Sequence, residues 1–139
     1  MLGANGRRGT AAGLVSGCGM GKSIASFVLP WPPSNLSPNA RLHWGARQRL
    51  VRQYRQVCWS TALQQGAKPI EADRVAVHLV FVPPNRRARD WDNLIASMKS
   101  GLDGLADAIS VDDSRWRLSF EVAEGEIGGM VRVRVEVTA

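Results

Sequence analysis

Two pairs of aspartates, of a type and spacing suited to chemistry, lie between residues 86 and 117. Asp90 and Asp92 belong to the run R-R-A-R-D-W-D-N-L, and Asp112 and Asp113 belong to V-D-D-S-R. If the backbone at the first pair is extended, both carboxylates point to the same side and Trp91 points away. Gathered carboxylates repel one another, and a bound Mg²⁺ or Mn²⁺ relieves the repulsion by using their hard oxygens as ligands. The two pairs therefore indicate a divalent-metal site.

Each pair also has an ordinary structural interpretation. Asp92, which precedes N-L-I, could cap a helix by accepting hydrogen bonds from its first backbone N–H groups. Asp112, Asp113 and Ser114 could form a polar turn before a strand. The metal interpretation is favoured because both pairs lie beside arginines, which would bind a phosphodiester, whereas simple charge neutralisation requires no paired acids. These arginines are Arg86, Arg87, Arg89, Arg115 and Arg117.

The segment between the two pairs has the period of a helix. Its apolar residues recur at helical spacing, which predicts a helix over residues 93–109 with one buried face. Asp103 and Asp107 are placed on its surface. Gly101 and Gly104 would either admit the backbone of a partner chain or weaken the helix by about 1 kcal/mol each. The apolar residues are Leu94, Ile95, Met98, Leu102, Leu105 and Ile109.

The remaining elements complete an α+β pattern. Alternation predicts strands at residues 24–29 and 74–82, the second with both faces buried. Residues 116–122 and 130–137 alternate like the two strands of a hairpin joined by E-G-E-I-G-G. With a second long helix after the first strand, the order is strand, helix, strand, helix, hairpin. This order predicts a single α+β domain with one mixed β-sheet and two main helices.

The long helix, over residues 41–65, carries arginines and no acidic residue. An arginine-rich face could simply be solvated. However, soluble helices commonly mix both signs of charge, so the missing acids favour contact with phosphates. The arginines concerned are Arg41, Arg47, Arg49, Arg52 and Arg55. The line of residues predicted to face inward is Leu50, Tyr54, Val57, Cys58 and Thr61.

Two further side chains are assigned to packing. Trp31, held between prolines in L-P-W-P-P-S-N, is expected to cover the core. His78, in the middle of a strand, is expected to be packed and hydrogen-bonded rather than catalytic.

The composition limits the class of protein. At 139 residues and 45% hydrophobic, the chain fits one domain, and no apolar run approaches the ~18 residues of a membrane span. Its 18 Lys and Arg against 12 Asp and Glu leave a formal net charge of +6, which favours nucleic acid as a polyanionic partner. Cys18 and Cys58 form neither a disulfide framework nor a zinc motif, so we expect a reducing, cytoplasmic compartment.

Residues 1–23 are rich in Gly, Ala, Ser and Arg. They hold too few bulky apolar groups to offset the entropy of ordering them, so we expect a disordered leader before a domain over residues 24–139. The leader lacks the apolar core of a signal peptide. An alternative translation start at Met20 would remove most of it.

Three motifs together resemble the RusA-type Holliday junction resolvases, from about residue 26 to the C-terminus. They are L-P-W-P-P-S-N, R-R-x-R-D-W-D-N-L and V-D-D-S-R, in that order and spacing. The resemblance implies a homodimeric, Mg²⁺-dependent endonuclease that cuts four-way DNA junctions in symmetric pairs, in DNA recombination and repair. It places the family's three catalytic aspartates on Asp90, Asp92 and Asp113, with Asp112 as a neighbour.

The chain departs from this family at the catalytic lysine. Family members often place it about one helical turn after the second aspartate, where this chain has Ala96. Lys99 lies seven residues after Asp92, nearly in line with it and about 10 Å further along the helix axis. A helical lysine points back toward the N-terminus, so Lys99 is the candidate. It could instead form a surface ion pair with Asp103.

These residues predict metal-assisted hydrolysis of DNA. Asp90, Asp92 and Asp113 would hold one or two Mg²⁺ ions, with Mn²⁺ as an alternative, and Lys99 would offset charge on the phosphate. Water is the expected nucleophile, because no Ser or Cys has a His and an acid arranged around it. DNA would be bound by arginines of the two basic segments: Arg47, Arg49, Arg52, Arg86, Arg87 and Arg89. Two alternatives stay open, a non-catalytic DNA-binding protein and a metal-dependent nuclease for other branched or nicked DNA.

Overall fold

The computed structural model describes residues 22–138, with side chains from residue 25 onward. The described chain begins with strand β3 (Lys22–Pro30), a short 3₁₀ helix η1 (Ser34–Leu36) and helix α1 (Trp44–Gln64). Strand β4 (Val75–Val82), helix α2 (Trp91–Ile109) and a second 3₁₀ helix η2 (Asp113–Arg115) follow, and strands β5 (Trp116–Val122) and β6 (Met130–Val137) complete it. The predicted leader lies outside the described residues, except that residues 22 and 23 already belong to β3.

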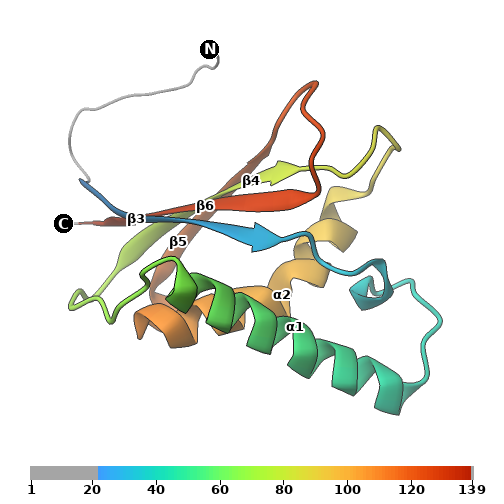
Figure 1. Ribbon diagram of the computed structural model, residues 1–139, viewed down its shortest axis with the longest axis horizontal. Helices are drawn as coiled ribbons and strands as arrows, with labels where there is room; N and C mark the ends of the chain where they lie inside the picture. Colours follow the sequence, from blue (N-terminus) through green and yellow to red (C-terminus); the bar gives the residue numbers. More distant parts are fainter. Residues whose placement is uncertain (1–21, 139) are drawn as a thin grey trace.

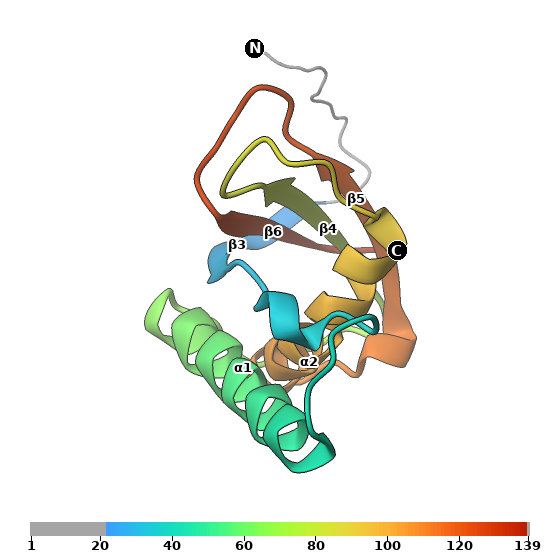
Figure 2. The same cartoon turned by 90° about the vertical axis from the view of Figure 1, so that its right-hand side faces the viewer.

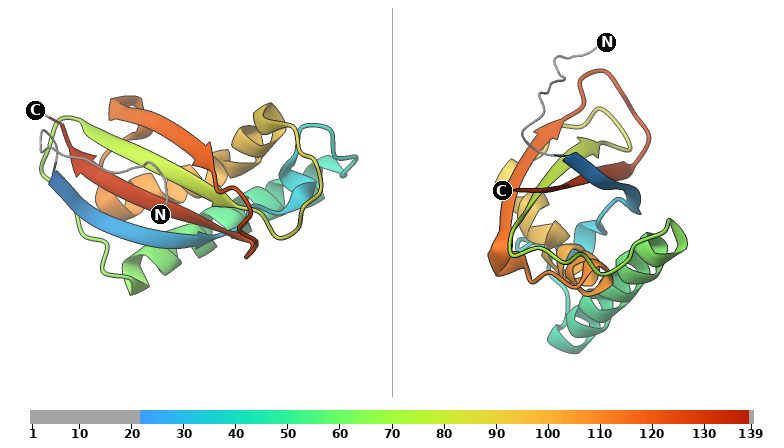
Figure 3. Two further views of the ribbon diagram at one scale, coloured as in Figure 1. Left: turned by 90° about the horizontal axis from the view of Figure 1, so that it is seen from above. Right: turned by 90° about the vertical axis from the view of Figure 1, so that its left-hand side faces the viewer.

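The four strands form one mixed sheet in the order β3-β6-β4-β5. β6 pairs antiparallel with both β3 and β4, and β5 runs parallel to β4. Seen from above in Figure 3, β3 and β5 form the two edges of the sheet. The predicted α+β class with two helices and one mixed sheet is confirmed. The predicted hairpin of β5 and β6 is wrong, because β4 lies between these strands.

The length of the connections explains this strand order. Parallel strands need a long crossover, and α2 supplies it between β4 and β5. The loop over residues 123–129 is longer than the ~2–5 residues of ordinary hairpin loops, so β5 and β6 need not be neighbours. It is bonded to the end of β4 instead: Gly128 donates its backbone N–H to the carbonyl of Pro83 at 2.8 Å.

Both helices cover one face of the sheet (Figure 1, Figure 2). On β4 the alternate residues Val75, Val77, Leu79 and Phe81 are fully buried, as strand alternation requires. The other face of β4 is mostly half-buried, so the prediction of two buried faces holds only in part. No helix in the described part of the chain is long and apolar enough to cross a membrane.

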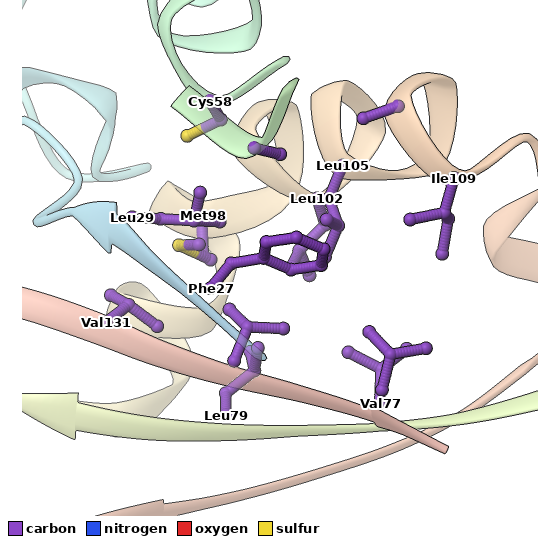
Figure 4. Close-up of a cluster of buried hydrophobic side chains, with 14 of the residues drawn as sticks. Phe27, Leu29, Cys58, Val77, Leu79, Met98, Leu102, Leu105, Ile109 and Val131 are labelled. Atoms are coloured by element: carbon purple, nitrogen blue, oxygen red, sulfur yellow. The ribbon is translucent and has the colours of Figure 1, made fainter. Parts of the chain in front are cut away.

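The core lies between the sheet and the two helices. Figure 4 shows Phe27 and Leu29 of β3 gathered with Leu79 of β4 and with Met98 and Leu105 of α2, all of them buried. At one end, Trp31 meets the ring of Phe81 edge-on with centroids 5.9 Å apart, which confirms that it covers the core.

The two helices approach closely because α2 presents glycines to α1. A Cβ atom at Gly101 would lie 2.6 Å from the ring of Tyr54, and one at Gly104 would lie 2.3 Å from the carbonyl oxygen of Arg55. Both glycines therefore serve packing within the chain. The prediction that they admit the backbone of a partner is wrong.

This contact also defines the inward face of α1. Tyr54, Cys58 and Ala62 are buried there, and Leu50 packs beside them. Val57 is 45% exposed, contrary to the prediction. The buried residues Tyr54, Cys58 and Ala62 recur every four residues, and Val57 lies to one side of their line.

Replacing Gly104 by alanine is expected to lower the free energy of unfolding by about 1–3 kcal/mol, because the added carbon has no room against a backbone carbonyl. Gly45→Ala is the matched control: the nearest atoms to its Cβ would be those of the His43 ring, at 3.5 Å, and of the Arg49 side chain, and alanine is the better helix former. Chemical denaturation of both variants measures the difference. Equal stability of the two variants would contradict the close packing of α1 on α2.

Candidate active site

The first acidic pair lies at the N-terminus of α2. Asp90 is the N-cap: its backbone is extended (φ −87°, ψ 119°), and its Oδ1 accepts a hydrogen bond from the backbone N–H of Asp92 at 2.9 Å. The helix begins at Trp91, so the expected extended conformation holds for Asp90 alone, and Asp90 rather than Asp92 caps the helix. Asp92 is exposed in the first turn, where the helix dipole favours a negative charge.

The second acidic pair is brought back alongside α2. The helix ends at Ser110 in the left-handed conformation (φ 59°), and Val111 is buried. Asp112 then caps η2 by accepting from the hydroxyl and from the backbone N–H of Ser114, and these hydrogen bonds lower the pKa of the Asp112 carboxyl below its ordinary value. The polar turn considered from the sequence is present. It leaves Asp113 directed at α2.

Lys99 joins Asp113 to the middle of α2. Its Nζ donates to Asp103 Oδ1 at 2.7 Å and also to Asp113 Oδ2. The hydrogen bond to Asp103, followed by that to Asp113, raises the pKa of Lys99 above its ordinary value. The ion pair with Asp103 that the sequence allows is therefore present, and Lys99 also contacts an aspartate named by the family resemblance.

Asp103 belongs to this group, in which the sequence interpretation gave it only a surface ion pair with Lys99. The sequence places it on the helix surface with Asp107, but its side chain is 31% exposed and shares Lys99 with Asp113. Asp107 is 48% exposed and pairs with Arg55 of α1 at 2.8 Å. The signal was the spacing of Lys99 and Asp103, because side chains four residues apart lie on the same helix face.

Asp92, Lys99 and Asp103 lie in one line along α2, which we call the α2 ridge; Asp92 and Lys99 are exposed, and Asp103 is half-buried. At about 100° per residue, Lys99 and Asp103 each lie within about 20° of Asp92 around the helix axis. The rise from Asp92 to Lys99 is about 10 Å, so Asp90 and Asp92 form one group and Lys99, Asp103 and Asp113 form the next.

The fit to a divalent metal depends on the first group. Within the part of the chain that the structure describes, no three His, Cys, Asp or Glu side chains are grouped closely enough to hold a metal ion. Mg²⁺ in phosphate-processing sites is usually bound by one or two carboxylates, with waters and substrate phosphates as the other ligands, and Asp90 and Asp92 fit that requirement. The convergence of Asp113 on the same ion stays a prediction.

Two of the six predicted DNA-binding arginines donate hydrogen bonds to loops of the same chain. Arg47 donates to the backbone carbonyls of Asn35, Leu36 and Ser37 at 3.1–3.3 Å. Arg89 donates to the carbonyl and side chain of Asn85 and to the carbonyl of Arg87, and its guanidinium lies 5.4 Å from the centre of the Trp31 ring. These two guanidinium groups are largely occupied within the chain.

The other four arginines are exposed and make no side-chain hydrogen bond to the residues that the structure describes. Arg49 and Arg52 line a shallow hollow along α1 together with Gln53 and Gln56. Arg86 and Arg87 line another hollow between the loop before α2 and the loop after β5. These four are available for phosphates.

A hydrogen-bonded chain of Ser119, His78 and Glu121 corrects the expectation that no serine has a histidine and an acid arranged around it. His78 Nδ1 lies 2.7 Å from Ser119 Oγ, and its Nε2 lies 2.8 Å from Glu121 Oε1, on the sheet face opposite the helices. The hydrogen bonding predicted for His78 is confirmed. Ser119 lies in mid-strand, where its backbone N–H faces β4 and cannot serve an oxyanion hole. We therefore assign this chain of bonds to fastening β4 to β5.

Comparison with known proteins shows a family relationship but does not indicate a chemistry for this chain. No protein-family model matches the chain. It is 37% identical over 121 residues to a protein of Xylella fastidiosa that is described as uncharacterized, an alignment that covers 84% of this chain and 78% of the relative. The chain belongs to the family of that protein. We therefore infer the function from the residues of the site.

Replacing Asp103 by asparagine is expected to lower the pKa of Lys99 toward its ordinary value, whereas Asp107→Asn should leave it unchanged. Because the folded pKa of Lys99 is raised, its pairs stabilise the fold below about pH 10, the unfolded value, and the stabilisation is lost as the pH rises through the folded pKa. NMR titration of the Lys99 side chain measures both variants. An unchanged Lys99 pKa in Asp103→Asn would show that the pair does not form in solution.

Proposed function

We propose that this chain is a Mg²⁺-dependent endodeoxyribonuclease that hydrolyses phosphodiesters at four-way DNA junctions. The observation that carries the proposal is the α2 ridge with its two neighbours: the cap residue Asp90 precedes Asp92 at the start of the helix, and Asp113 of η2 contacts Lys99 beside Asp103. Metal-dependent phosphodiester hydrolysis needs hard anionic ligands beside a cation that compensates phosphate charge. The resemblance of three motifs to the RusA-type resolvases supplies the substrate.

Asp90 and Asp92 would hold the metal ion. Capping occupies Asp90 Oδ1, and among the described residues no hydrogen bond reaches its Oδ2 or the carboxylate of Asp92. When bound, Mg²⁺ would polarise the phosphodiester and lower the pKa of an attacking water. The position of Asp90 at the start of α2 fixes these oxygens to a rigid element.

Lys99 would act on the phosphate from the second group. Its ammonium has three N–H donors, and two of them bond Asp103 and Asp113, so one is left for a phosphate oxygen. Those two carboxylates also keep Lys99 protonated, since they raise its pKa. Asp113 is in this way held beside the α2 ridge, and its convergence with Asp90 and Asp92 on one metal ion is part of the proposal.

DNA would be bound by the arginines that are not occupied within the chain, Arg49, Arg52, Arg86 and Arg87. Each phosphate contact releases a counterion, so affinity should fall steeply as salt rises. Two symmetric incisions at a four-way junction call for two active sites, and a homodimer is the simplest way to provide them.

Replacing Asp92 or Asp113 by asparagine is expected to reduce junction cleavage in Mg²⁺ by more than about 100-fold, because even changes to groups behind metal ligands cost about 10- to 100-fold. Junction binding should be kept or become tighter, since a negative charge is removed. Asp107→Asn is the matched control on the same helix and should cut at nearly the wild-type rate. Cleavage assays and gel-shift titrations on one synthetic junction measure the two properties separately.

The same assay on junction, plain duplex and flap substrates tests the substrate. The proposal expects cleavage of the junction, none in EDTA, and much slower cleavage of the other two. If the protein cleaves a flap or a nicked duplex faster than the junction, its substrate is that other DNA structure and not the four-way junction. Binding without any Mg²⁺-dependent cleavage, or an Asp113→Asn protein that cuts normally, would contradict the proposed mechanism.

A further inference from the structure

Strand β5 is an open edge of the sheet. It pairs with β4 on one side, and within residues 22–138 no strand pairs with its other side (Figure 3). Its five central residues, 117–121, are exposed, with Leu118 at 41% and Phe120 at 44%. An exposed edge strand with apolar side chains readily pairs with another strand through its free N–H and C=O groups.

The opposite edge of the sheet is closed at its middle. On β3, the backbone N–H of Val28 donates to Gln65 Oε1 at 2.7 Å, and Gln65 Nε2 donates to the carbonyl of Val28 at 2.8 Å. A side-chain amide from the end of α1 thus occupies the place of a neighbouring strand. The middle of the β3 edge is therefore covered by a side chain, whereas the β5 edge is open and can pair with another strand.

The direction of each backbone group on β5 follows from one hydrogen bond. Ala123 donates its N–H to the carbonyl of Phe81 in β4 at 2.9 Å. Because backbone groups alternate along a strand, those of Arg117, Ser119 and Glu121 also face β4, and those of Leu118 and Phe120 face the open edge. The side chains alternate as well, with Leu118 and Phe120 on one face of the sheet and Arg117, Ser119 and Glu121 on the other.

The sequence of β5 is complementary to itself when it is reversed about Ser119. An antiparallel copy centred there sets Leu118 opposite Phe120, and their outward N–H and C=O groups are in register to exchange hydrogen bonds. On the other face the same register sets Arg117 opposite Glu121, twice across the two-fold axis. Glu121 uses Oε1 for His78, which leaves its other oxygen for the arginine.

We propose that two copies of this chain associate through β5, antiparallel and centred on Ser119, so that the two four-stranded sheets become one. The neighbouring registers, centred on Leu118 or on Phe120, also align outward backbone groups. However, they set Arg117 opposite Ser119 or opposite Ala123, so neither forms an ion pair within β5. The register centred on Leu118 would set Glu121 opposite Arg115, but Arg115 belongs to η2 and lies outside the strand. Charge complementarity therefore selects the register centred on Ser119. The dimer agrees with the proposed function, which calls for two sites, but pairing through β5 does not require that the protein cleaves DNA.

Charge reversal tests the interface on DNA-free protein. Arg117→Glu and Glu121→Arg each place like charges opposite each other twice, so each is expected to raise the dimer dissociation constant by about tenfold or more. The double variant Arg117→Glu/Glu121→Arg restores both pairs across the axis and should restore the dimer. Light scattering over a concentration series measures the mass, and circular dichroism confirms that each variant is folded.

Cross-linking tests the register. In a Cys18→Ser background, Ser119→Cys should form a disulfide-linked dimer on mild oxidation, because the two copies of residue 119 would face each other within the ~4.4–6.8 Å Cα separation that a disulfide spans. Ala123→Cys is the control and should stay monomeric on denaturing gels, since its copies lie far apart in this register. A single-chain mass at all concentrations, a dimer insensitive to both charge reversals, or equal cross-linking of the two cysteine variants would overturn the proposal. None of these tests measures DNA cleavage, so the dimer can be refuted or supported separately from the proposed function.

Discussion

The close contact between α1 and α2 is the constraint on which the candidate site depends. With no side chain at Gly101 and Gly104, the ring of Tyr54 and the backbone at Arg55 press directly against α2. This contact and the burial of Met98 and its apolar neighbours leave α2 only one orientation. The opposite side, which carries the α2 ridge, must then face outward. A rigid packing contact between two helices in this way decides where the charged groups of the site lie.

The return of the chain after α2 adds the second part of the site. Ser110 adopts a left-handed conformation, Val111 is buried, and Asp113 is thereby laid against Lys99. The two groups of charge are about 10 Å apart along one helix, a distance set by the helical rise. The site is thus built from one helix and one turn, and its supporting elements are the sheet and α1 beneath them.

The elements with strong periodicity could be predicted from the sequence. The apolar period places a helix over residues 93–109, and the structure extends it by two residues because Asp90, not Asp92, supplies the cap. The pairing of β5 could not be predicted, since alternation defines a strand but not its neighbour, and β4 takes the place between β5 and β6. The bond of Ser119 to His78 was missed for the same reason, because it joins two strands that meet only after folding. The ion pair of Lys99 with Asp103 could be predicted, because the two residues lie four apart on one helix.

Metal binding is the central property of the proposed site, because Asp90, Asp92 and the rest of the α2 ridge are proposed to form a divalent-cation site. The measurement is the relaxation of backbone amide signals by substoichiometric Mn²⁺ in the DNA-free protein. We expect the amides of residues 90–93 to broaden first and that of Asp113 next, while those around Asp107 stay sharp and Asp92→Asn abolishes the effect. Broadening centred on another acidic residue, or none that Asp92→Asn removes, would contradict it.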